Sequence, residues 1–320
     1  RDGSVQFLAR SPEAQQMLIN YLNNQGMRAY PLTLHPVHTV RRAIIPVAGF
    51  GTRLYPATRA LKKDFFPIPC PDGKVRPVIL ILLEELVKSG IEEICLVLGS
   101  QEEREQYAEF FEKPLSEEHL RKLSAENREY ENQILDIGSR LRYVYQEEKR
   151  GFGHAVYQAV EFAREEPVLL LLGDTMYRSA INKPCALQLI EQYEHYNQLL
   201  VSIHDVPLSD VSHYGILSGI WEDKDECILN VSTMYEKPTP DYAEEFLGVR
   251  NKGGQHHYYS VFGQYVLTPE VFHQLEQDIR EADEQDDHLR EIELTTALDH
   301  VREEYGMMGV RLQGEMYDMG

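Results

Sequence analysis

The sequence has little cysteine: four residues in 320, with no two close enough to form a Cys-x-x-Cys pair. Scattered cysteines of this kind are typical of free thiols in a reducing compartment, and they argue against a disulfide framework or a zinc site. The sequence therefore predicts a cytoplasmic protein whose fold needs neither disulfide bonds nor structural zinc.

Long apolar runs are also missing. The longest are Val78–Leu83 and Val168–Leu172, which suit buried segments and are too short to span a membrane. Basic residues are scarce beside acidic ones, 32 against 52, which gives a formal net charge of −20. Such a surface repels nucleic acid and anionic membranes, so neither is expected as a partner. A small anionic ligand would need a local cluster of cations, backbone N–H groups or metal.

No internal repeat is visible, and what is present is an alternation of buried strands with helices. This alternation predicts an α/β fold with a mostly parallel central sheet flanked by helices. Ligands of such sheets bind beyond the carboxyl ends of the strands. The expected strands are residues 42–48, 94–98, 141–145 and 168–172, followed by 199–204, 214–217, 228–235 and 260–267.

The domain organisation follows from changes in this pattern. Residues 1–40 are expected to form a helical appendage and linker, and residues 41–320 one catalytic domain. A charged helical insert is expected at about residues 100–140, opened by a capping box at Ser100–Glu103. In the second half of the chain the order of strands and helices is less regular, which predicts a smaller part of the same domain with a mixed sheet. Composition leaves a homo-oligomer open.

The most informative segment is Gly49-Phe50-Gly51-Thr52-Arg53, directly after the first expected strand. Glycines let backbone N–H groups approach a phosphate, and the arginine adds a fork suited to phosphate oxygens. A dinucleotide-binding loop would need a small residue at Leu54, and a Walker A loop would need Gly-Lys-Ser/Thr. The prolines that follow predict an extended loop projecting Arg53, Lys62 and Lys63 over the strand ends; a simple tight turn is the alternative.

Gly49–Arg53, with Lys63 and Pro67 downstream, resembles the opening signature of the sugar-1-phosphate nucleotidyltransferases. Residues 57–64 are most similar to the bacterial UTP–glucose-1-phosphate uridylyltransferases. The resemblance covers about residues 42–320, with gaps at the insert and at Cys70–Pro77. It implies a Rossmann-like nucleotidyltransferase fold with a sugar-binding part, Mg²⁺ as cofactor, and a nucleoside triphosphate and a sugar 1-phosphate as substrates.

The same resemblance assigns roles to individual residues. Arg53 and Lys63 are implied as the catalytic cations. Gln146 is implied to read the uracil edge, which suits an amide because it offers both a donor and an acceptor. Gly151 is implied to keep the wall beside the base thin. The implied nucleotide-binding residues are Ala48, Gly49, Gly51, Thr52, Gln146 and Gly151.

Two aspartates are candidate Mg²⁺ ligands. Gly173-Asp174 ends the buried run Val168–Leu172, and ligands bind beyond the end of such a strand; a helix-capping role for Asp174 is the alternative. Asp318 precedes Gly320 and resembles the second metal-binding aspartate of the family.

The resemblance also implies a sugar-phosphate site, although the sequence departs from the family there. Its implied residues are Tyr214, Gly215, Glu236, Lys237 and Glu291. Thr296 stands where relatives usually carry aspartate, and His257–Ser260 replaces a segment that supplies an asparagine to the sugar. These departures bear on the identity of the sugar more than on the type of reaction.

The preferred function is transfer of UMP to glucose 1-phosphate. Thymidylyl or another nucleotidyl transfer is the close alternative, because it differs only in base and sugar contacts. A non-catalytic regulatory homologue would not need to retain Arg53, Lys63 and Asp174 together. A dehydrogenase is disfavoured by Leu54 and the prolines.

Overall fold

The computed structural model describes residues 39–49, 51–285, 287 and 290–319. The predicted appendage at residues 1–40 lies outside this part of the chain except for its last two positions, so it stays a prediction. No helix in the described residues has both the length and the apolar character needed to cross a membrane.

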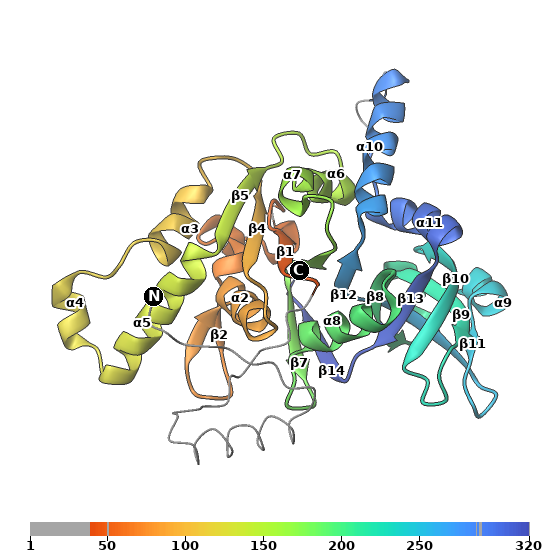
Figure 1. Ribbon diagram of the computed structural model, residues 1–320, viewed down its shortest axis with the longest axis horizontal. Coiled ribbons are helices and arrows are strands. Elements are labelled where there is room, and N and C mark those ends of the chain that lie inside the picture. The colour runs from red at the N-terminus through yellow and green to blue at the C-terminus, as the bar shows by residue number, and fades with distance from the viewer. Residues whose placement is uncertain (1–38, 50, 286, 288–289, 320) are drawn as a thin grey trace, which may run out of the picture. The chain divides into compact units, whose positions relative to one another are not determined.

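Ten strands of the described chain form one sheet, which confirms the α/β class (Figure 1). Its strand order is β5 (Leu141–Tyr145), β4 (Glu93–Leu98), β1 (Arg42–Pro46), β6 (Val168–Leu171), β12 (His256–Leu267), β8 (Leu199–Val206), β13 (Met307–Arg311), β10 (Ile228–Glu236) and β9 (Gly215–Trp221), with β11 (Val249–Arg250) paired to β12.

The first four strands in this order are parallel, as are β8 and β13, whereas β12 runs antiparallel to β6 and β8. Successive side chains of a strand point to opposite faces, and the parallel strands β1, β4 and β6 are buried on both. In β1, Ile44 packs in one core cluster and Ile45 in the other. The continuous apolar runs of the sequence thus reflect a sheet covered on both faces.

Two groups of helices cover those faces. One group, α2 (Val78–Lys88) and α8 (Cys185–Tyr196), contributes its apolar residues to the core cluster of Ile45. The other packs into the cluster of Ile44 and comprises α6 (Phe152–Tyr157), α7 (Val160–Ala163), α10 (Pro269–Glu284) and α11 (Leu294–Tyr305). The predicted layering of helices on a central sheet is therefore observed.

The insert is helical, as predicted, and consists of α3 (Arg104–Phe111), α4 (Glu117–Lys122) and α5 (Ala125–Ser139). The predicted capping box is wrong, because α3 starts at Arg104 with no side-chain cap. Glu103 instead accepts a hydrogen bond from the Gly99 N–H at 3.1 Å and pairs with Lys62 at 2.6 Å. The Glu103 carboxylate, which the local sequence pattern predicted to cap a helix, is thus engaged in a tertiary ion pair with Lys62.

The segment after β1 is coiled, so the prediction of an extended loop is wrong. It forms three short 3₁₀ turns, η1 (Thr52–Leu54), η2 (Ala57–Arg59) and η3 (Lys63–Phe65), before the hairpin β2 (Pro67–Pro69) and β3 (Val75–Pro77). Prolines prevent a long α-helix but tolerate single turns of this kind.

The remaining elements lie in the second half of the chain. A two-stranded sheet joins β7 (Thr175–Ser179) to β14 (Gly314–Asp318). A 3₁₀ helix, η4 (Leu208–His213), and α9 (Pro240–Phe246) pack together beside β9 and β12.

Candidate active site

The carboxyl ends of the parallel strands surround a cavity of about 370 Å³. Each strand contributes the loop that follows it, as expected for an open α/β sheet. Seven of the predicted site residues line this cavity: Ala48, Gly49, Lys63, Gln146, Gly151, Asp174 and Glu291. The chain therefore brings residues from five separate segments to one edge of the sheet.

Asp174 is the centre of a charge cluster at one end of this cavity. Its Oδ2 atom lies 2.8 Å from Lys63 Nζ and 3.9 Å from Arg53 Nη2. Arg53 Nη1 also lies 3.4 Å from Asp318 Oδ2. Two predicted cations and two predicted metal ligands thus meet at one place. The Lys63 side chain is 12% exposed and that of Arg53 65% exposed, so Arg53 has far more freedom to move onto a ligand.

The β7–β14 ladder explains why Asp318 lies there. Its register pairs Asp318 with Thr175, the residue after Asp174. The backbone N–H of Met319 then donates to the Asp174 carbonyl at 2.8 Å. The pairing brings two aspartates 144 positions apart in sequence into one cluster.

The glycine-rich loop packs directly on the Lys63 side chain. Gly51 has a φ of 62°, and a Cβ there would lie 2.9 Å from Thr58 Cγ2 and 3.3 Å from Lys63 Cδ. This position therefore requires glycine. Thr52 begins the next turn and is exposed, and neither it nor Gly51 lines the cavity. Their predicted nucleotide contact stays a prediction.

Asp64, the residue after Lys63, is buried beneath this loop and pairs with Lys62, and it was not predicted from sequence as a site residue. Its side chain is fully buried and accepts a hydrogen bond from the Tyr107 hydroxyl at 2.8 Å. Burial raises the pKa of Asp64, while the charge of Lys62, 3.6 Å away, opposes that rise. Lys62 therefore lies among carboxylates, and it is not among the residues that line the cavity.

Gln146 and Gly151 form the other end of the cavity. Gln146 Nε2 donates to the Gly151 carbonyl at 2.9 Å. Gly151 has φ 96° and ψ 175°, and a Cβ there would lie 2.7 Å from the Ile292 carbonyl oxygen. His154 is buried beside Gln146, and burial together with Arg150 lowers its pKa. A neutral, packed histidine fits a structural role better than a catalytic one.

Lys149 is a cation in this cavity that the sequence motifs missed. Its Nζ donates to the Ala48 carbonyl at 3.0 Å, across 101 positions of sequence. Burial lowers its pKa, the negative charge of Glu103 raises it, and Lys62 lowers it further. Its position two residues before Gly151 was the only sequence signal that could have identified it.

Four of the five predicted sugar-phosphate residues lie together in a second cluster. The fifth, Glu291, lines the first cavity. The register of β9 and β10 pairs Gly215 with Glu236, and the Lys237 N–H donates to the Tyr214 carbonyl at 3.0 Å. A Cβ on Gly215 would lie 3.0 Å from Glu236 Oε2. Lys237 Nζ lies 3.5 Å from Glu236 Oε1.

Thr295 is a further residue of this cluster that sequence reasoning did not single out. Its hydroxyl donates to Glu236 Oε2 at 3.0 Å. It follows Glu291 by four positions, and Glu291 lines the first cavity. The segment 291–295 therefore contacts both groups of predicted site residues.

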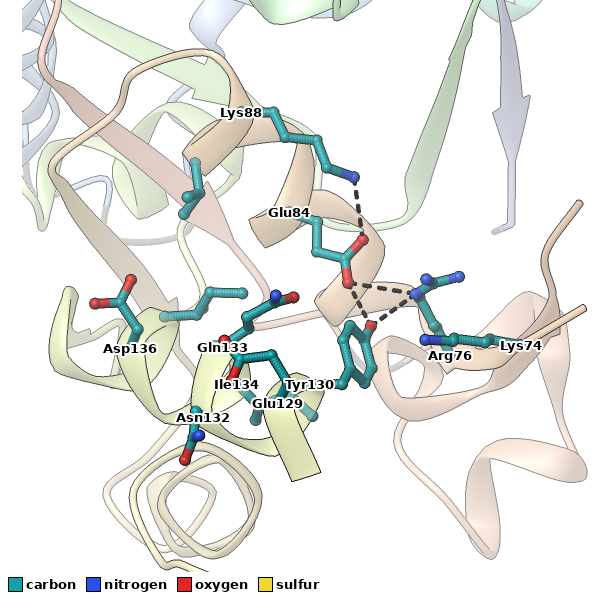
Figure 2. Close-up of a pocket in the computed structure, with 12 residues that line it drawn as sticks. Lys74, Arg76, Glu84, Lys88, Glu129, Tyr130, Asn132, Gln133, Ile134 and Asp136 are labelled. Carbon is teal, nitrogen blue, oxygen red and sulfur yellow. Dashed lines mark hydrogen bonds and ion pairs between the residues drawn. The ribbon is translucent and has the colours of Figure 1, made fainter. Parts of the chain in front are cut away.

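A second cavity, of about 510 Å³, lies between the β2–β3 hairpin, α2 and α5 (Figure 2). There Tyr130 accepts a hydrogen bond from Arg76 Nε at 2.7 Å and donates one to Glu84. Arg76 also pairs with Asp72 at 2.6 Å. These contacts join the helical insert to the hairpin and indicate a structural role for this cavity.

The fold and the site together define an α/β protein with a glycine-rich loop, clustered cations and paired carboxylates at the carboxyl edge of its parallel strands. The comparisons with known proteins make the class specific. Residues 42–311 match the family model described as nucleotidyl transferase. The chain belongs to this family and is a nucleotidyltransferase enzyme.

Two similar curated proteins are named UTP–glucose-1-phosphate uridylyltransferase. One, from Streptococcus pneumoniae, is 32% identical and aligns over 88% of this chain and 86% of its own. The other, from Streptococcus pyogenes, is 33% identical over 88% and 84%. A solved structure titled apo-UDP-glucose pyrophosphorylase matches with a TM-score of 0.70 and 25% identity, covering 88% of this chain and 93% of that one. The resemblance drawn from the sequence is thereby confirmed.

Proposed function

We propose that this enzyme transfers UMP from UTP to glucose 1-phosphate, forming UDP-glucose and pyrophosphate. The observation that carries the proposal is the cluster in which Lys63, Arg53 and two aspartates converge at one end of a cavity whose other end holds Gln146. The names of relatives at 32–33% identity support UTP and glucose 1-phosphate as the substrates.

The reaction is an in-line displacement at phosphorus. A phosphate oxygen of glucose 1-phosphate forms a bond to the α-phosphorus of UTP. The bond from that phosphorus to the oxygen bridging the α- and β-phosphates breaks, and pyrophosphate leaves with the electron pair. No covalent enzyme intermediate is needed, so the protein acts by positioning and by stabilising charge.

Lys63 and Arg53 are the residues that stabilise this charge. Lys63 is held at a fixed point beside Asp174, which suits the α-phosphoryl group. Exposed ion pairs contribute little free energy, so Arg53 loses little by exchanging its carboxylate partners for the departing pyrophosphate. A single oxyanion donor contributes about 10²–10³ in rate, and we expect the same order for each cation.

Asp174 and Asp318 fit a bound Mg²⁺. This ion takes one or two carboxylates and fills its remaining positions with water and substrate phosphate. The two side chains are 23% and 42% exposed, which leaves room for such ligands. Among the described residues no group of three or more His, Cys, Asp or Glu could hold a metal alone, in keeping with a site that substrate completes. When bound, the ion would neutralise phosphate charge.

The second cluster suits the sugar phosphate. Lys237 would pair with the phosphate of glucose 1-phosphate, and Glu236 would accept hydrogen bonds from sugar hydroxyls. The 3.0 Å hydrogen bond from Thr295 fixes one Glu236 oxygen and leaves lone pairs on the other. Glu291 lines the cavity proposed for the nucleotide, and the segment that it shares with Thr295 supports a role for Glu291 between the two substrates.

Pyrophosphate release tests the proposal. Purified enzyme is incubated with glucose 1-phosphate, Mg²⁺ and, in separate reactions, UTP, dTTP, CTP, ATP or GTP. We expect rapid release with UTP and formation of UDP-glucose. Faster turnover of dTTP would assign the thymidylyl alternative. Absence of turnover with all five nucleotides would favour a regulatory homologue.

A further inference from the structure

The segment Glu291–Thr295 leads into α11 and contacts both groups of predicted site residues. Glu291 lines the first cavity, and the Thr295 hydroxyl donates to Glu236 Oε2 at 3.0 Å. The preceding helix α10 and α11 itself pack on each other and on α6 (Figure 1). The place of this segment beside the loop between β5 and α6 therefore determines where both side chains lie.

Ile292 attaches this segment to that loop through its backbone. Its N–H donates to the Arg150 carbonyl at 2.8 Å, and its own carbonyl accepts from the Gly153 N–H at 2.8 Å. A Cβ on Gly151 or on Gly153 would lie 2.7 or 2.8 Å from the same carbonyl oxygen. The two backbones thus approach as closely as glycine allows.

The Arg150 side chain holds the helix that precedes the segment. Its Nη1 lies 2.8 Å from Oδ1 of Asp283, in the last turn of α10, and the side chain is only 8% exposed. Its Nε and Nη2 are buried, and neither has a hydrogen-bond partner in the part of the chain that the structure describes. One residue therefore contacts α10 through its guanidinium and the segment through its carbonyl.

We propose that Arg150 is a positioning residue for the sugar-phosphate site. By holding both α10 and Ile292, it sets the place of Glu291 and Thr295. Arg150 is not among the residues that line the nucleotide cavity, so it acts through the segment and not by contact there. This inference rests on the proposed function, because that function assigns the two side chains to glucose 1-phosphate.

The ion pair of Arg150 with Asp283 supplies geometry more than stability. Taking two charges out of water costs about as much as their attraction returns, and an apolar side chain of similar volume often replaces a buried pair without loss. The two unpaired nitrogens of Arg150 reduce its net contribution further. We therefore expect Arg150→Met to fold, while the end of α10 becomes free to shift.

The nucleotide side of the loop has its own attachments. The Gln146 N–H donates to the Leu98 carbonyl at the end of β4 at 2.8 Å, and its side chain donates to the Gly151 carbonyl at 2.9 Å. Neither bond uses the Arg150 side chain. Loss of the guanidinium should thus affect the sugar phosphate and leave UTP largely unaffected.

Steady-state kinetics test this separation. For Arg150→Met we expect the KM for glucose 1-phosphate to rise about three- to tenfold, the range for substitutions that act through a connecting element, with the KM for UTP within about twofold. Arg150→Lys should recover most of the loss, because one N–H donor suffices for Asp283. Arg280→Met is the matched control, since Arg280 lies on α10, is 65% exposed and pairs with Glu276. It should leave both KM values unchanged.

Equilibrium binding provides a readout without turnover. UDP-glucose carries the sugar and UDP lacks it, so calorimetric titration with each isolates the sugar subsite. Arg150→Met should weaken UDP-glucose by the same factor and leave UDP unchanged. Equal weakening of both ligands would overturn the inference, as would unchanged binding of UDP-glucose.

A double-mutant comparison tests whether Arg150 and Asp283 act as a pair. Arg150→Met/Asp283→Asn should raise the KM for glucose 1-phosphate no further than Arg150→Met alone, and additive rises would overturn the inference. If thermal unfolding shows that Arg150→Met does not fold, Asp283→Asn replaces it and must raise the same KM.

The wild type separates this inference from the proposed function. A wild type that turns over UTP with glucose 1-phosphate, while its folded variants keep an unchanged KM for the sugar phosphate, overturns this inference alone. A wild type that releases no pyrophosphate with glucose 1-phosphate overturns the proposed function and the inference together.

Discussion

Lys63 Nζ lies 2.8 Å from Asp174 Oδ2, although 111 positions separate the two residues in sequence. The pair joins the glycine-loop segment to the end of β6. In this pair the Asp174 carboxylate balances the positive charge of Lys63. A phosphoryl group entering the cavity therefore meets a cation already fixed in position, and little reorganisation is needed during the reaction.

Replacing Lys63 with alanine should lower kcat by about 10²–10³, because a fixed cation at the reacting phosphorus is lost. Lys63→Arg should recover part of this loss. The measurement is the steady-state rate of pyrophosphate release with saturating UTP and glucose 1-phosphate. Lys88→Ala is the matched control, since Lys88 is 65% exposed and pairs only with Glu84 among the described contacts. Unchanged turnover in Lys63→Ala would refute the assignment of the catalytic cation.

Removal of divalent metal should stop the reaction. We expect dialysis against a chelator to abolish pyrophosphate release and added Mg²⁺ to restore it. Asp174→Asn should raise the Mg²⁺ concentration needed for half-maximal rate more than Asp318→Asn does, because Asp174 is less exposed and also holds Lys63. Metal-independent turnover would contradict the assignment of both aspartates.

The sugar cluster gives a prediction that separates the two substrates. Glu236→Gln should raise the KM for glucose 1-phosphate about tenfold while leaving that for UTP within twofold, because a charged hydrogen-bond acceptor is worth ~1.5–3 kcal/mol. Thr295→Val should produce a smaller change in the same direction, since it frees one Glu236 oxygen. A larger rise in the KM for UTP than in the KM for glucose 1-phosphate would contradict the assignment of Glu236 to the sugar subsite.

Much of this fold could be predicted because the signals are local. Continuous apolar runs such as Val168–Leu172 indicate strands buried on both faces, and β6 is one of them. Polar residues just beyond such runs, Gln146 and Asp174, line the cavity at the carboxyl ends of the strands for the same reason. The prolines around the glycine loop predicted the absence of a long helix correctly, but not the 3₁₀ turns.

The features that sequence did not reveal depend on contacts between distant residues. The capping pattern at Ser100–Glu103 was overridden by the Lys62 ion pair, 41 positions away. Lys149 contacts Ala48 across 101 positions, and Tyr107 reaches Asp64 across 43. Such pairs become visible only when the sheet register has placed the loops beside one another.

His154 predicts a pH dependence of stability. Burial and Arg150 lower its pKa below the ordinary 6.5, so the folded protein binds this proton less tightly than the unfolded chain. The contribution of His154 to the free energy of unfolding must therefore fall as the pH drops below about 6.5. His154→Gln lacks this titration, so its stability relative to the wild type should improve as the pH is lowered from about 7.5 to 5.5. Urea unfolding at several pH values measures this difference, and a constant difference across the range would exclude the effect.

Gly151 allows a sharper test of backbone geometry at the proposed nucleotide site. Its φ of 96° and ψ of 175° lie in a region that essentially only glycine adopts, and a Cβ would lie 2.7 Å from the Ile292 carbonyl oxygen. Gly151→Ala should thus combine backbone strain of ~1–3 kcal/mol with overpacking of ~1–3 kcal/mol. It should also raise the KM for UTP, because the Gly151 carbonyl orients Gln146.

Gly73 is the matched control for that substitution. It too has a positive φ, 81°, but a Cβ there would meet no atom within 4 Å. Gly73→Ala should cost only the strain, ~1 kcal/mol, and leave the KM for UTP unchanged, because Gly73 lies in the β2–β3 turn away from the cavity. Urea unfolding and steady-state kinetics on both variants make the comparison. Equal destabilisation by the two substitutions would show that the close approach of Ile292 to Gly151 does not restrict this position.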